Sequence, residues 1–544
     1  MDTSPEEAYD VVVLGTGVAG LAAAIAAAEA GASVGLLEKD DLVGGTSAYS
    51  GGMVWIPDNH LMRAEGIEDS EEAALTYLAS MSHGMIDPEM ARTFVTRAPG
   101  IVQWLDENTE VAFHIVAGMP DYHPERPGGC TTGGRSLECD LYGFEALGEW
   151  KDRIALGAQN FHPYYMMSET PIGSPMPVQL SAEELDRRRE GNLRGVGQSL
   201  VGRMLRACLD RGVLPVTGTA GRRLVVEDGA VVGVEVEDAD GIRVVRARGG
   251  VVLATGGFDH DPELIRSFLR GPLTRVVSPP TNTGDGLKMA MRVGAALGNM
   301  REAWWVPIVD VPHETGGTYS FLVSADRAKP HSIMVNSAGR RFTNEAANYN
   351  SAGAAFHVID PHRFEYVNLP AWMVMDSDFL AKYGFAKNPP GSDFGWLTSA
   401  DTLEELAERI GVSPGGLAET VEHYNKNCAA GHDPDFGRGS SKHDTWWGDP
   451  AYKGTPAATL GPVARGPFYA IEVHPGALGT RGGPKTDEVG AVLGVDGERL
   501  RGLYAAGNAM ASPLGMAYGG GGGTLAVGIV FGFLAGADAA AAAR

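Results

Sequence analysis

Three glycines near the N-terminus, Gly15, Gly17 and Gly20, have the GxGxxG spacing of a dinucleotide-binding loop. Gly15 permits a tight turn, Gly17 lets the backbone approach a pyrophosphate, and Gly20 lets the next helix pack closely on the preceding strand. Glu38 follows at the spacing at which an acid accepts hydrogen bonds from a ribose. These four residues predict a nucleotide cofactor whose pyrophosphate lies at a helix N-terminus.

The segments around these residues support that interpretation. Residues 10–14 (DVVVL) have the pattern of a buried strand, and an alanine-rich helix is predicted to run to residue 30. A second strand is predicted over residues 33–37, and Glu38 stands at its end. The order strand, glycine loop, helix, strand is that of a dinucleotide-binding βαβ unit, so the motif lies in the context that it requires.

A second glycine-rich segment, residues 44–52 (GGTSAYSGG), distinguishes between cofactors. A nicotinamide-binding domain has no need of such a loop, whereas flavoproteins use one to run backbone beside the pyrophosphate and the flavin. The segment contains no histidine, so we expect non-covalent FAD rather than a histidyl-linked flavin. The expected cofactor contacts are Gly44, Gly45, Thr46, Ser50, Gly51 and Gly52.

Later segments continue the flavin pattern. Residues 251–257 (VVLATGG) read as another strand that ends in small residues, residues 284–286 precede an amphipathic helix, and residues 502–508 read as a last strand. Together they predict one large flavin domain that is assembled from both ends of the chain. Their expected cofactor contacts are Ala254, Thr255, Gly256, Asp285, Gly507 and Asn508.

Five consecutive glycines, residues 519–523, precede an apolar segment. Because such a run has a high conformational entropy cost on folding, we expect its backbone to pass very close to a flat object, the FAD ring system. The apolar segment reads as a helix whose N-terminus directs free N–H groups and a positive dipole end at that ring system. The expected contacts here are Gly523, Thr524 and Leu525.

Five motifs together resemble the fumarate reductase/succinate dehydrogenase flavoprotein superfamily. They are the GxGxxG loop, residues 44–57 (GGTSAYSGGMVWIP), 254–257 (ATGG), 339–345 (GRRFTNE) and 504–508 (YAAGN). Within it the chain resembles the 3-ketosteroid dehydrogenases over nearly its whole length, least from about residue 130 to 198, where the chain carries extra material. The resemblance implies non-covalent FAD and no NAD(P) site.

The expected fold is α/β: a Rossmann-like FAD-binding domain built from both ends of the chain, with an inserted α+β substrate-capping domain. We place the FAD-binding domain at residues 1–303 and 479–544, and the capping domain at 304–478. The middle segment breaks the flavin pattern with a Trp-Trp-Val-Pro motif at its start and an acidic helix predicted over 401–411. A reaction centre is expected at the domain junction, where ligand pockets commonly lie.

The resemblance implies α,β-dehydrogenation of a cyclic ketone, most specifically Δ1-desaturation of a 3-ketosteroid. In the family pattern the Tyr518 hydroxyl and the Gly522 N–H hold the ketone oxygen, and Tyr349, four positions after Glu345, takes the α-proton. A free tyrosine, with a pKa of about 10, is a poor base at neutral pH, so a second hydroxyl or a positive field must stabilise the tyrosinate. Tyr122 is the candidate helper, and its alternative role is ordinary packing. The family often has prolines where this chain has only glycine, which leaves the pocket shape open.

Other activities stay open. The alternatives are dehydrogenation of smaller cyclic ketones of the cyclohexanone type, a Δ4-(5α)-ketosteroid dehydrogenase, an ene reductase of the fumarate type, and a non-catalytic flavin-binding protein. A dicarboxylate site would need an Arg/His cluster, for which Arg481 and His474 are candidates, although ordinary structural roles are favoured for both. Tyr349 stands where fumarate reductases carry arginine, which weakens that alternative. Residues 161–167 (FHPYYMM) could line an apolar pocket, but core packing is favoured.

Composition limits the partners. The net charge of −24 and the pI of about 5.0 argue against nucleic acid and anionic membranes. The four cysteines form no CxxC pair, so no metal or iron–sulfur site is predicted, and their sparse use with an N-terminus that lacks signal-peptide order predicts a cytoplasmic protein. Residues 524–543 are apolar enough to resemble a membrane span, but Asp538 and many small residues favour a buried core helix. We expect an external electron acceptor such as a quinone, and the oligomeric state stays open.

Overall fold

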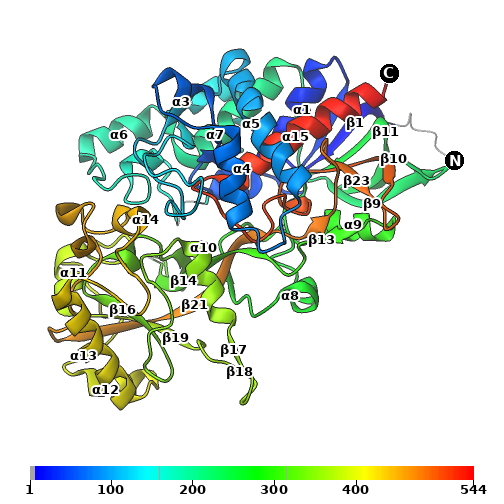
Figure 1. Cartoon of the computed structure of the whole chain (residues 1–544). Helices are drawn as coiled ribbons and strands as arrows, with labels where there is room; N and C mark the ends of the chain where they lie inside the picture. The colour runs from blue at the N-terminus through cyan, green and yellow to red at the C-terminus, as the bar shows by residue number, and fades with distance from the viewer. Residues whose placement is uncertain (1–6, 158–159, 314) are drawn as a thin grey trace.

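The computed structural model describes residues 7–157, 160–313 and 315–544. Residues 1–6, 158–159 and 314, which belong to the segments assigned above to the FAD-binding and capping domains, lie outside the described residues. The described chain folds around two sheets that occupy opposite ends of the molecule (Figure 1). The start of the described chain and its C-terminus both lie at the end that holds the first sheet.

The first sheet has parallel central strands and the order β23–β24–β11–β1–β2–β8, with β9 and β10 as an antiparallel extension. The four last residues of β1 are buried valines and a leucine, as expected of a strand covered on both faces. The strands are β1 (Glu7–Leu14), β2 (Val34–Leu37), β8 (Pro215–Val216), β9 (Ala220–Glu227), β10 (Ala230–Asp238), β11 (Gly241–Leu253), β23 (Ala491–Leu493) and β24 (Arg499–Ala505).

Assembly of this sheet from both ends of the chain is confirmed. Strand β24 pairs in parallel with β11, with Val251 opposite Leu503. The predicted βαβ unit is present as β1, α1 (Val18–Glu29) and β2, with boundaries that differ from the expectation by one to three residues. The remaining helices of this part are α2 (Gly45–Tyr49), α3 (His60–Ala64), α4 (Glu71–Ser80), α5 (Pro88–Asn108), α6 (Ala182–Glu190), α7 (Val196–Asp210), α8 (Pro262–Phe268), α9 (Asp285–Arg292) and α15 (Gly523–Ala542).

Helix α15 packs directly along α1 (Figure 1). A Cβ on Gly532 would stand 2.2 Å from the carbonyl oxygen of Ala19, and a Cβ on Gly536 would stand 2.1 Å from that of Ala23. Only glycine at these two positions therefore permits the observed approach of the helices. In the described residues α15 is the one helix long and apolar enough to cross a membrane, and most of it is buried against the molecule, as a core helix is.

The second sheet forms the base of the inserted part and has the order β15–β14–β21–β19–β16, with β12 and β20 also paired to β21. Strand β12 comes from residues before the predicted start of the capping segment at 304. These strands are β12 (Arg275–Val276), β14 (Ala303–Pro312), β15 (Thr318–Leu322), β16 (Ser332–Asn336), β19 (Ala371–Met375), β20 (Thr398–Ala400) and β21 (Phe468–Thr480). The helices are α10 (Tyr349–Ala354), α11 (Ser377–Tyr383), α12 (Leu403–Ile410), α13 (Pro414–Ala430) and α14 (Lys442–Trp446).

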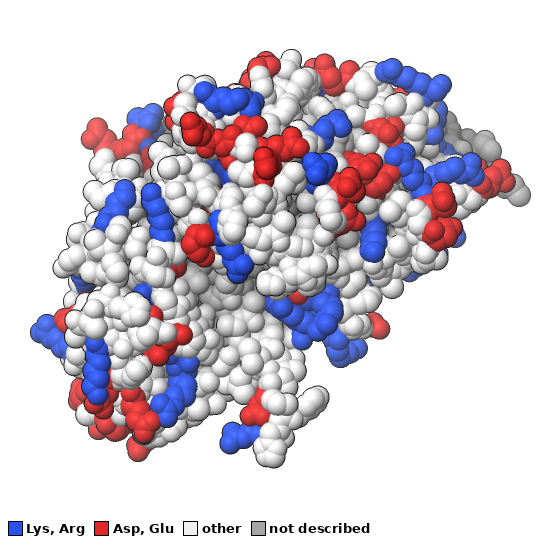
Figure 2. Space-filling view, in the orientation of Figure 1, with Lys and Arg blue, Asp and Glu red and all other residues white. Residues whose placement is uncertain are grey.

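Short strands complete the described fold. They are β3 (Val54–Trp55), β4 (Phe113–Ile115) and β5 (Ser136–Cys139) in one small sheet, and the pairs β6 (Tyr142–Gly143) with β7 (Leu193–Arg194), β13 (Leu297–Gly298) with β22 (Gly483–Pro484), and β17 (Ile359–Asp360) with β18 (Glu365–Tyr366). Acidic and basic side chains are interspersed over the face shown in Figure 2, with basic side chains gathered around α8 near the junction of the two parts. Despite that local cluster the chain carries a net charge of −24.

The approach of α15 to α1 is open to a direct test. We expect Gly532→Val to lower the free energy of unfolding by about 2–3 kcal/mol, because the added atoms overlap the backbone of α1. Gly100→Ala is the control: its Cβ meets nothing within 4 Å at an exposed position of α5, so stability should stay within about 1 kcal/mol. Urea unfolding followed by circular dichroism measures both, and an unchanged midpoint for Gly532→Val would contradict the observed packing.

Candidate active site

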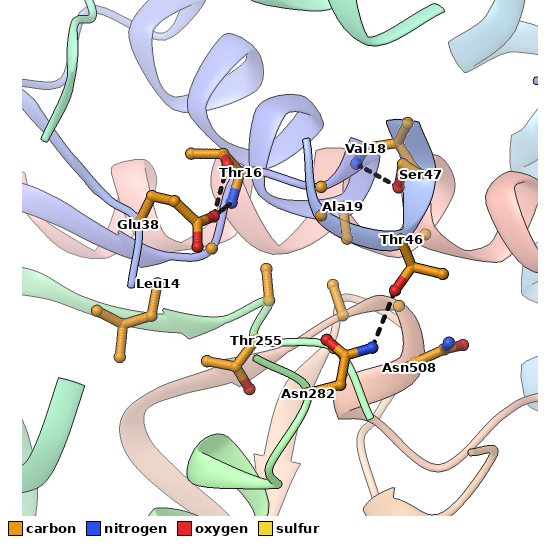
Figure 3. A pocket seen from close by; sticks show the side chains of 18 of the residues that line it. Leu14, Thr16, Val18, Ala19, Glu38, Thr46, Ser47, Thr255, Asn282 and Asn508 are labelled. Atoms are coloured by element: carbon orange, nitrogen blue, oxygen red, sulfur yellow. Dashed lines mark hydrogen bonds between the residues drawn. The ribbon is translucent and has the colours of Figure 1, made fainter. Parts of the chain in front are cut away.

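A groove opens where β1 and β11 end and α1 and α15 begin (Figure 3). It combines the N-terminal glycine loop with the C-terminal segment, as the two-ended assembly requires. The expected cofactor residues that line it are Gly15, Gly17, Glu38, Gly45, Thr46, Ala254, Thr255, Gly256, Asp285, Gly507, Asn508, Thr524 and Leu525. The other expected cofactor residues lie elsewhere: Ser50, Gly51 and Gly52 line a neighbouring cavity, and Gly20, Gly44 and Gly523 line neither.

The groove fits the pyrophosphate-bearing cofactor that its motif predicts. Gly15 has a φ of +107°, and a Cβ there would stand 2.3 Å from the carbonyl oxygen of Ala254. A Cβ on Gly20 would stand 1.8 Å from the carbonyl oxygen of Gly15, so Gly20 serves helix packing rather than the groove. The Thr255 Oγ1 atom in the wall is buried without a partner, which suits a polar ligand. Backbone and hydroxyl groups around a helix N-terminus suit an anionic diphosphate.

Glu38 already has partners in the protein. Its carboxylate accepts hydrogen bonds from Thr16 N at 2.9 Å and Thr16 Oγ1 at 2.6 Å, which ties the end of β2 to the glycine loop (Figure 3). The Asp40 N–H donates to its other oxygen at 2.9 Å. Burial raises the pKa of Glu38, and these donors oppose the rise. Since a carboxylate has about four acceptor sites, room for a ribose hydroxyl remains.

The groove residues that sequence reasoning missed include three with polar side chains: Thr16, Lys39 and Asn282. Asn282 Nδ2 donates to Thr46 Oγ1 at 2.9 Å and so bridges two loops (Figure 3). Lys39 Nζ donates to Asp285 Oδ2 at 2.8 Å, which occupies the carboxylate that we expected to face the cofactor. Lys39 directly follows Glu38, and Asn282 lies just before the 284–286 glycine pair, so proximity to those motifs was the available signal.

A second cavity adjoins the groove and shares Thr46, Thr524 and Leu525 with it. It contains about 800 Å³ of empty space, its open mouth included. All four residues predicted to do chemistry, Tyr122, Tyr349, Tyr518 and Gly522, line it. The described residues of its wall carry no charged side chain and are mainly apolar or aromatic: Tyr49, Met53, Asn160, Phe161, Met167, Ile172, Val277, Leu322 and Leu478 stand beside those already named.

The three tyrosine hydroxyls form one hydrogen-bonded chain. Tyr122 Oη donates to Tyr349 Oη at 2.9 Å, and Tyr349 Oη donates to Tyr518 Oη at 3.0 Å. Thr524 Oγ1 donates to Tyr518 Oη at 3.1 Å. Tyr349 is the first residue of α10, whose N-cap Asn348 accepts from the Ser351 N–H at 3.0 Å. Segments that are hundreds of residues apart in sequence thus meet at one point of the cavity.

Burial dominates the ionisation of these tyrosines. It raises the pKa of Tyr349 well above the usual value, and the neighbouring Tyr122 and Tyr518 raise it further because one added charge would face two other phenols. Burial also raises the pKa of Tyr518, but hydrogen bonds from Thr524 and Tyr349 and the positive charge of Arg481 oppose that rise. Negative charge is therefore least costly at the Tyr518 end of the chain.

The glycine run lies against protein. A Cβ on Gly520 would stand 2.4 Å from the Trp55 indole, and a Cβ on Gly522, whose φ is +102°, would stand 2.4 Å from the Met53 backbone. Tyr77 Oη and the Tyr122 N–H donate to the Gly519 carbonyl at 2.8 and 2.9 Å. We expected the flavin to account for the five glycines, but packing on Trp55 and Met53 already requires glycine.

Among the described residues, the cavity has no Arg/His cluster of the kind that a dicarboxylate would need. Arg481 is buried, and its guanidinium donates to the carbonyls of Gly515 and Ala517 at 2.9 and 2.7 Å. His474 lies 3.7 Å from Asp310 and lines neither the groove nor the cavity. Of the 161–167 segment, Phe161 and Met167 line the cavity. These two residues therefore line a pocket, the alternative that we favoured less than core packing.

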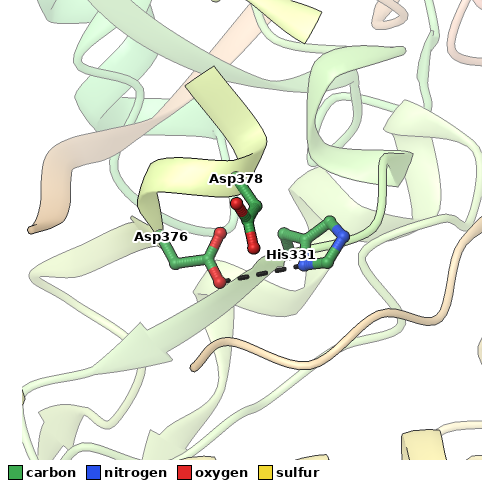
Figure 4. A group of neighbouring side chains, drawn as sticks. All are labelled: His331, Asp376 and Asp378. Atoms are coloured by element: carbon green, nitrogen blue, oxygen red, sulfur yellow. Dashed lines mark ion pairs between the residues drawn. The ribbon is translucent and has the colours of Figure 1, made fainter. Parts of the chain in front are cut away.

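One group of side chains among the described residues has the spacing of metal ligands: His331, Asp376 and Asp378 (Figure 4). Asp376 caps α11 by accepting from the Phe379 N–H at 3.1 Å, and its other oxygen accepts from the Ala464 N–H at 3.0 Å. His331 Nδ1 contacts the Pro462 carbonyl oxygen at 2.8 Å. These partners account for the group as a helix cap and loop anchor.

We expect Gly520→Ala to weaken FAD binding at least tenfold, because the methyl group overlaps Trp55 and displaces the loop that leads into α15. The control is Gly415→Ala in α13, where the added Cβ meets nothing within 4 Å, and FAD binding should be unchanged. Fluorescence titration of the apoprotein with FAD measures both. Equal affinity of the two variants would show that the glycine run does not position the groove.

Comparison with known proteins agrees with this geometry. Residues 10–525 match the family described as FAD binding domain. The chain is 40% identical over 542 residues to 4-oxocyclohexanecarboxylate 2-dehydrogenase of Sinomonas cyclohexanicum, covering 98% of this chain and 93% of that protein. It is 37% identical to 3-oxosteroid 1-dehydrogenase of Mycobacterium tuberculosis strain H37Rv, covering 97% of each.

A solved structure is similar throughout. It is 3-ketosteroid Δ1-dehydrogenase from Sterolibacterium denitrificans in complex with 1,4-androstadiene-3,17-dione, with a TM-score of 0.91 and 33% identity, covering 98% of this chain and all of that one. The chain therefore belongs to the FAD binding domain family, within the fumarate reductase/succinate dehydrogenase flavoprotein superfamily, and is an FAD-dependent oxidoreductase.

Proposed function

We propose that this protein catalyses α,β-dehydrogenation of a cyclic ketone, most specifically Δ1-desaturation of a 3-ketosteroid. One observation carries the proposal: Tyr122, Tyr349 and Tyr518 are joined by hydrogen bonds of 2.9 and 3.0 Å inside a cavity that adjoins the cofactor groove. The reaction centre would lie where the FAD-binding domain, residues 1–303 and 479–544, meets the capping domain, residues 304–478.

The groove residues would hold FAD through backbone N–H groups of the glycine loop, the Thr46 hydroxyl and the first turn of α15. When bound, FAD supplies the acceptor for the hydride that leaves the substrate β-carbon. Tyr518 Oη and the Gly522 N–H donate to the ketone oxygen, where negative charge grows as the α-proton leaves. Each such donor contributes roughly 3–4 kcal/mol to transition-state stabilisation.

Tyr349 removes the α-proton. Tyr122 Oη already donates to Tyr349 Oη at 2.9 Å, so it holds that hydroxyl in position. The apolar wall excludes water, so the enolate-like charge on the ketone oxygen is stabilised by these two donors, Tyr518 and Gly522, rather than by solvent. The roles of acid and base are thus divided between two hydroxyls that are already in contact, Tyr349 and Tyr518.

The pH dependence follows from burial. Because burial raises the pKa of Tyr349, only a small fraction of the base is ionised near neutral pH, and that fraction grows tenfold for each pH unit below the pKa. We expect log kcat/KM for the ketone to rise with a slope of about 1 between about pH 7 and 9. Stopped-flow flavin reduction over this range measures it, and a rate that falls as pH rises would exclude a tyrosinate base.

We expect Tyr349→Phe to lower the rate of flavin reduction by about 10³-fold, within the range for loss of a general base, while the product dienone still binds. Tyr452→Phe is the matched control, since Tyr452 is 50% exposed and lies outside the cavity. Single-turnover reduction and ligand titration give the two quantities. Full activity in Tyr349→Phe would assign the proton to another group.

The cavity wall favours a neutral, extended substrate. A carboxylate inside it would meet no cation among the described lining residues, and burying an unpaired carboxylate is costly. The 40% identity to 4-oxocyclohexanecarboxylate 2-dehydrogenase nevertheless supports a second candidate, a small cyclic keto acid. The steroid is favoured by the wall and the small acid by that relative.

Anaerobic bleaching of bound FAD separates the candidates. The substrates are 4-androstene-3,17-dione, a saturated 5α-3-ketosteroid, 4-oxocyclohexanecarboxylate, cyclohexanone and succinate. We expect bleaching at least a hundredfold faster with a steroid than with the small ketones. Preference for 4-oxocyclohexanecarboxylate would establish the second candidate, bleaching by succinate alone would reject ketone chemistry, and bleaching by none would reject dehydrogenation.

Electrons leave to an external acceptor, for which we propose a quinone or a similar carrier. The four cysteines are unpaired, which fits a reducing compartment such as the cytoplasm. A screen of quinones and dyes as acceptors, with the ketone that bleaches the flavin, identifies the class of acceptor.

A further inference from the structure

A buried arginine, Arg481, lies directly behind the ketone-binding end of the cavity. It follows the end of β21, and its guanidinium carbon stands 3.6 Å from the Trp304 ring centroid and 5.6 Å from that of Tyr518. The Trp304 and Tyr518 rings meet edge to face, with centroids 4.7 Å apart. Arg481 does not line the cavity itself, so it can act on a bound ketone only through its neighbours.

Its hydrogen bonds join the two segments that carry the reacting hydroxyls. Nη1 donates to the carbonyls of Gly515 and Ala517 at 2.9 and 2.7 Å, in the loop that ends at Tyr518. Nη2 donates to Asn350 Oδ1 at 3.0 Å, one residue after Tyr349. A single side chain thereby sets the position of Tyr518 relative to Tyr349.

The charge of this guanidinium is not compensated by an ion pair. Across the parts of the chain that the structure describes, no carboxylate lies within 4.0 Å of it, and its Nε is buried without a partner. Glu302 is the carboxylate that most favours its charge, yet Glu302 is paired to Arg270 at 3.3 Å and accepts from Trp305 Nε1 at 3.2 Å. Burial consequently lowers the pKa of Arg481 from the usual value of a guanidinium.

A buried charge without an ion-pair partner is costly, so its presence beside the cavity points to a use. The groups that the charge faces are phenols: Tyr518 and, beyond it, Tyr349, each of which in turn favours the charged guanidinium. Positive charge at that distance from a phenol favours partial negative charge on its oxygen.

We propose that Arg481 is a positioning residue whose positive charge makes the Tyr518 hydroxyl a stronger hydrogen-bond donor toward the ketone, while its hydrogen bonds hold the 515–517 loop in place. The inference rests on the proposed function, since the ketone oxygen is the acceptor concerned. The other titratable or charged groups that face this pair are Tyr122, Glu302 and Arg270.

The first experiment does not depend on activity. The tyrosinate absorbance of the holoenzyme is measured as a function of pH, for each Arg481 variant with Tyr518 present and with Tyr518→Phe. The difference between the two titration curves gives the pH at which the hydrogen-bonded tyrosines are half ionised, which we call the midpoint. We expect Arg481→Gln to raise the midpoint by about one pH unit or more and Arg481→Lys, which keeps the charge, to leave it within a few tenths. Arg501→Gln, at an exposed arginine of β24, is the control and should leave the midpoint unchanged.

A second variant acts in the opposite direction and keeps the test valid if Arg481→Gln does not bind FAD. Glu302→Gln removes the carboxylate that favours the Arg481 charge but keeps an acceptor for Trp305. Without the negative charge of Glu302, the positive potential at Tyr518 grows, so we expect the midpoint to fall. An unchanged midpoint in Glu302→Gln, or in a folded Arg481→Gln, would overturn the proposal.

Kinetics complete the test. We expect Arg481→Gln to lower kcat for flavin reduction by 10- to 100-fold, with the dissociation constant of 1,4-androstadiene-3,17-dione changed less than threefold, and Arg481→Lys to retain most of kcat. Equal loss in both variants with unmoved midpoints would mean that Arg481 is only structural. Shifted midpoints in a protein whose flavin no ketone reduces, even as wild type, would leave the effect of Arg481 on Tyr518 in place and reject the proposed function.

Discussion

The approach of α15 to α1 is the constraint on which the rest of the structure depends. Gly532 and Gly536 let α15 lie on the carbonyls of Ala19 and Ala23, and so the last segment of the chain becomes part of the first domain. The loop that precedes α15 is then held at the mouth of the N-terminal glycine loop. One helix contact thus brings the cofactor groove and the Tyr518 hydroxyl to adjoining cavities.

The tyrosine chain is the second organising feature. Three buried phenols satisfy one another, and Trp447 stacks on Tyr349 at 6.0 Å between centroids, so their positions are set from all sides. Each hydroxyl comes from a different segment, and no local sequence pattern joins them. A cluster of this kind is costly to ionise, and the guanidinium of Arg481 lies beside its Tyr518 end.

Much of the fold could be predicted, because its signals are local. The βαβ unit follows from a strand pattern, a glycine spacing and an acid, and those interactions span fewer than 40 residues. The reason for the five glycines could not be predicted, since it depends on Trp55, which is more than 460 residues away in sequence and reaches the run only in the folded state. The ion pair between Asp285 and Lys39 could not be predicted either, and neither could the position of Phe161 in the cavity wall rather than in the core.

Strand β21 connects the two parts of the molecule in a way that limits how substrate can enter. It is 13 residues long, pairs with β19 and β20 in the capping part and with β12 and β14 near the flavin part, and ends one residue before Arg481. In Figure 1 it crosses between the two parts as one continuous strand. A cap that swung open as a rigid lid would have to bend this strand or break its ladder, at about 1 kcal/mol for each hydrogen bond lost. A movement of the cap would therefore act on β21 and, through it, on Arg481, which follows its last residue.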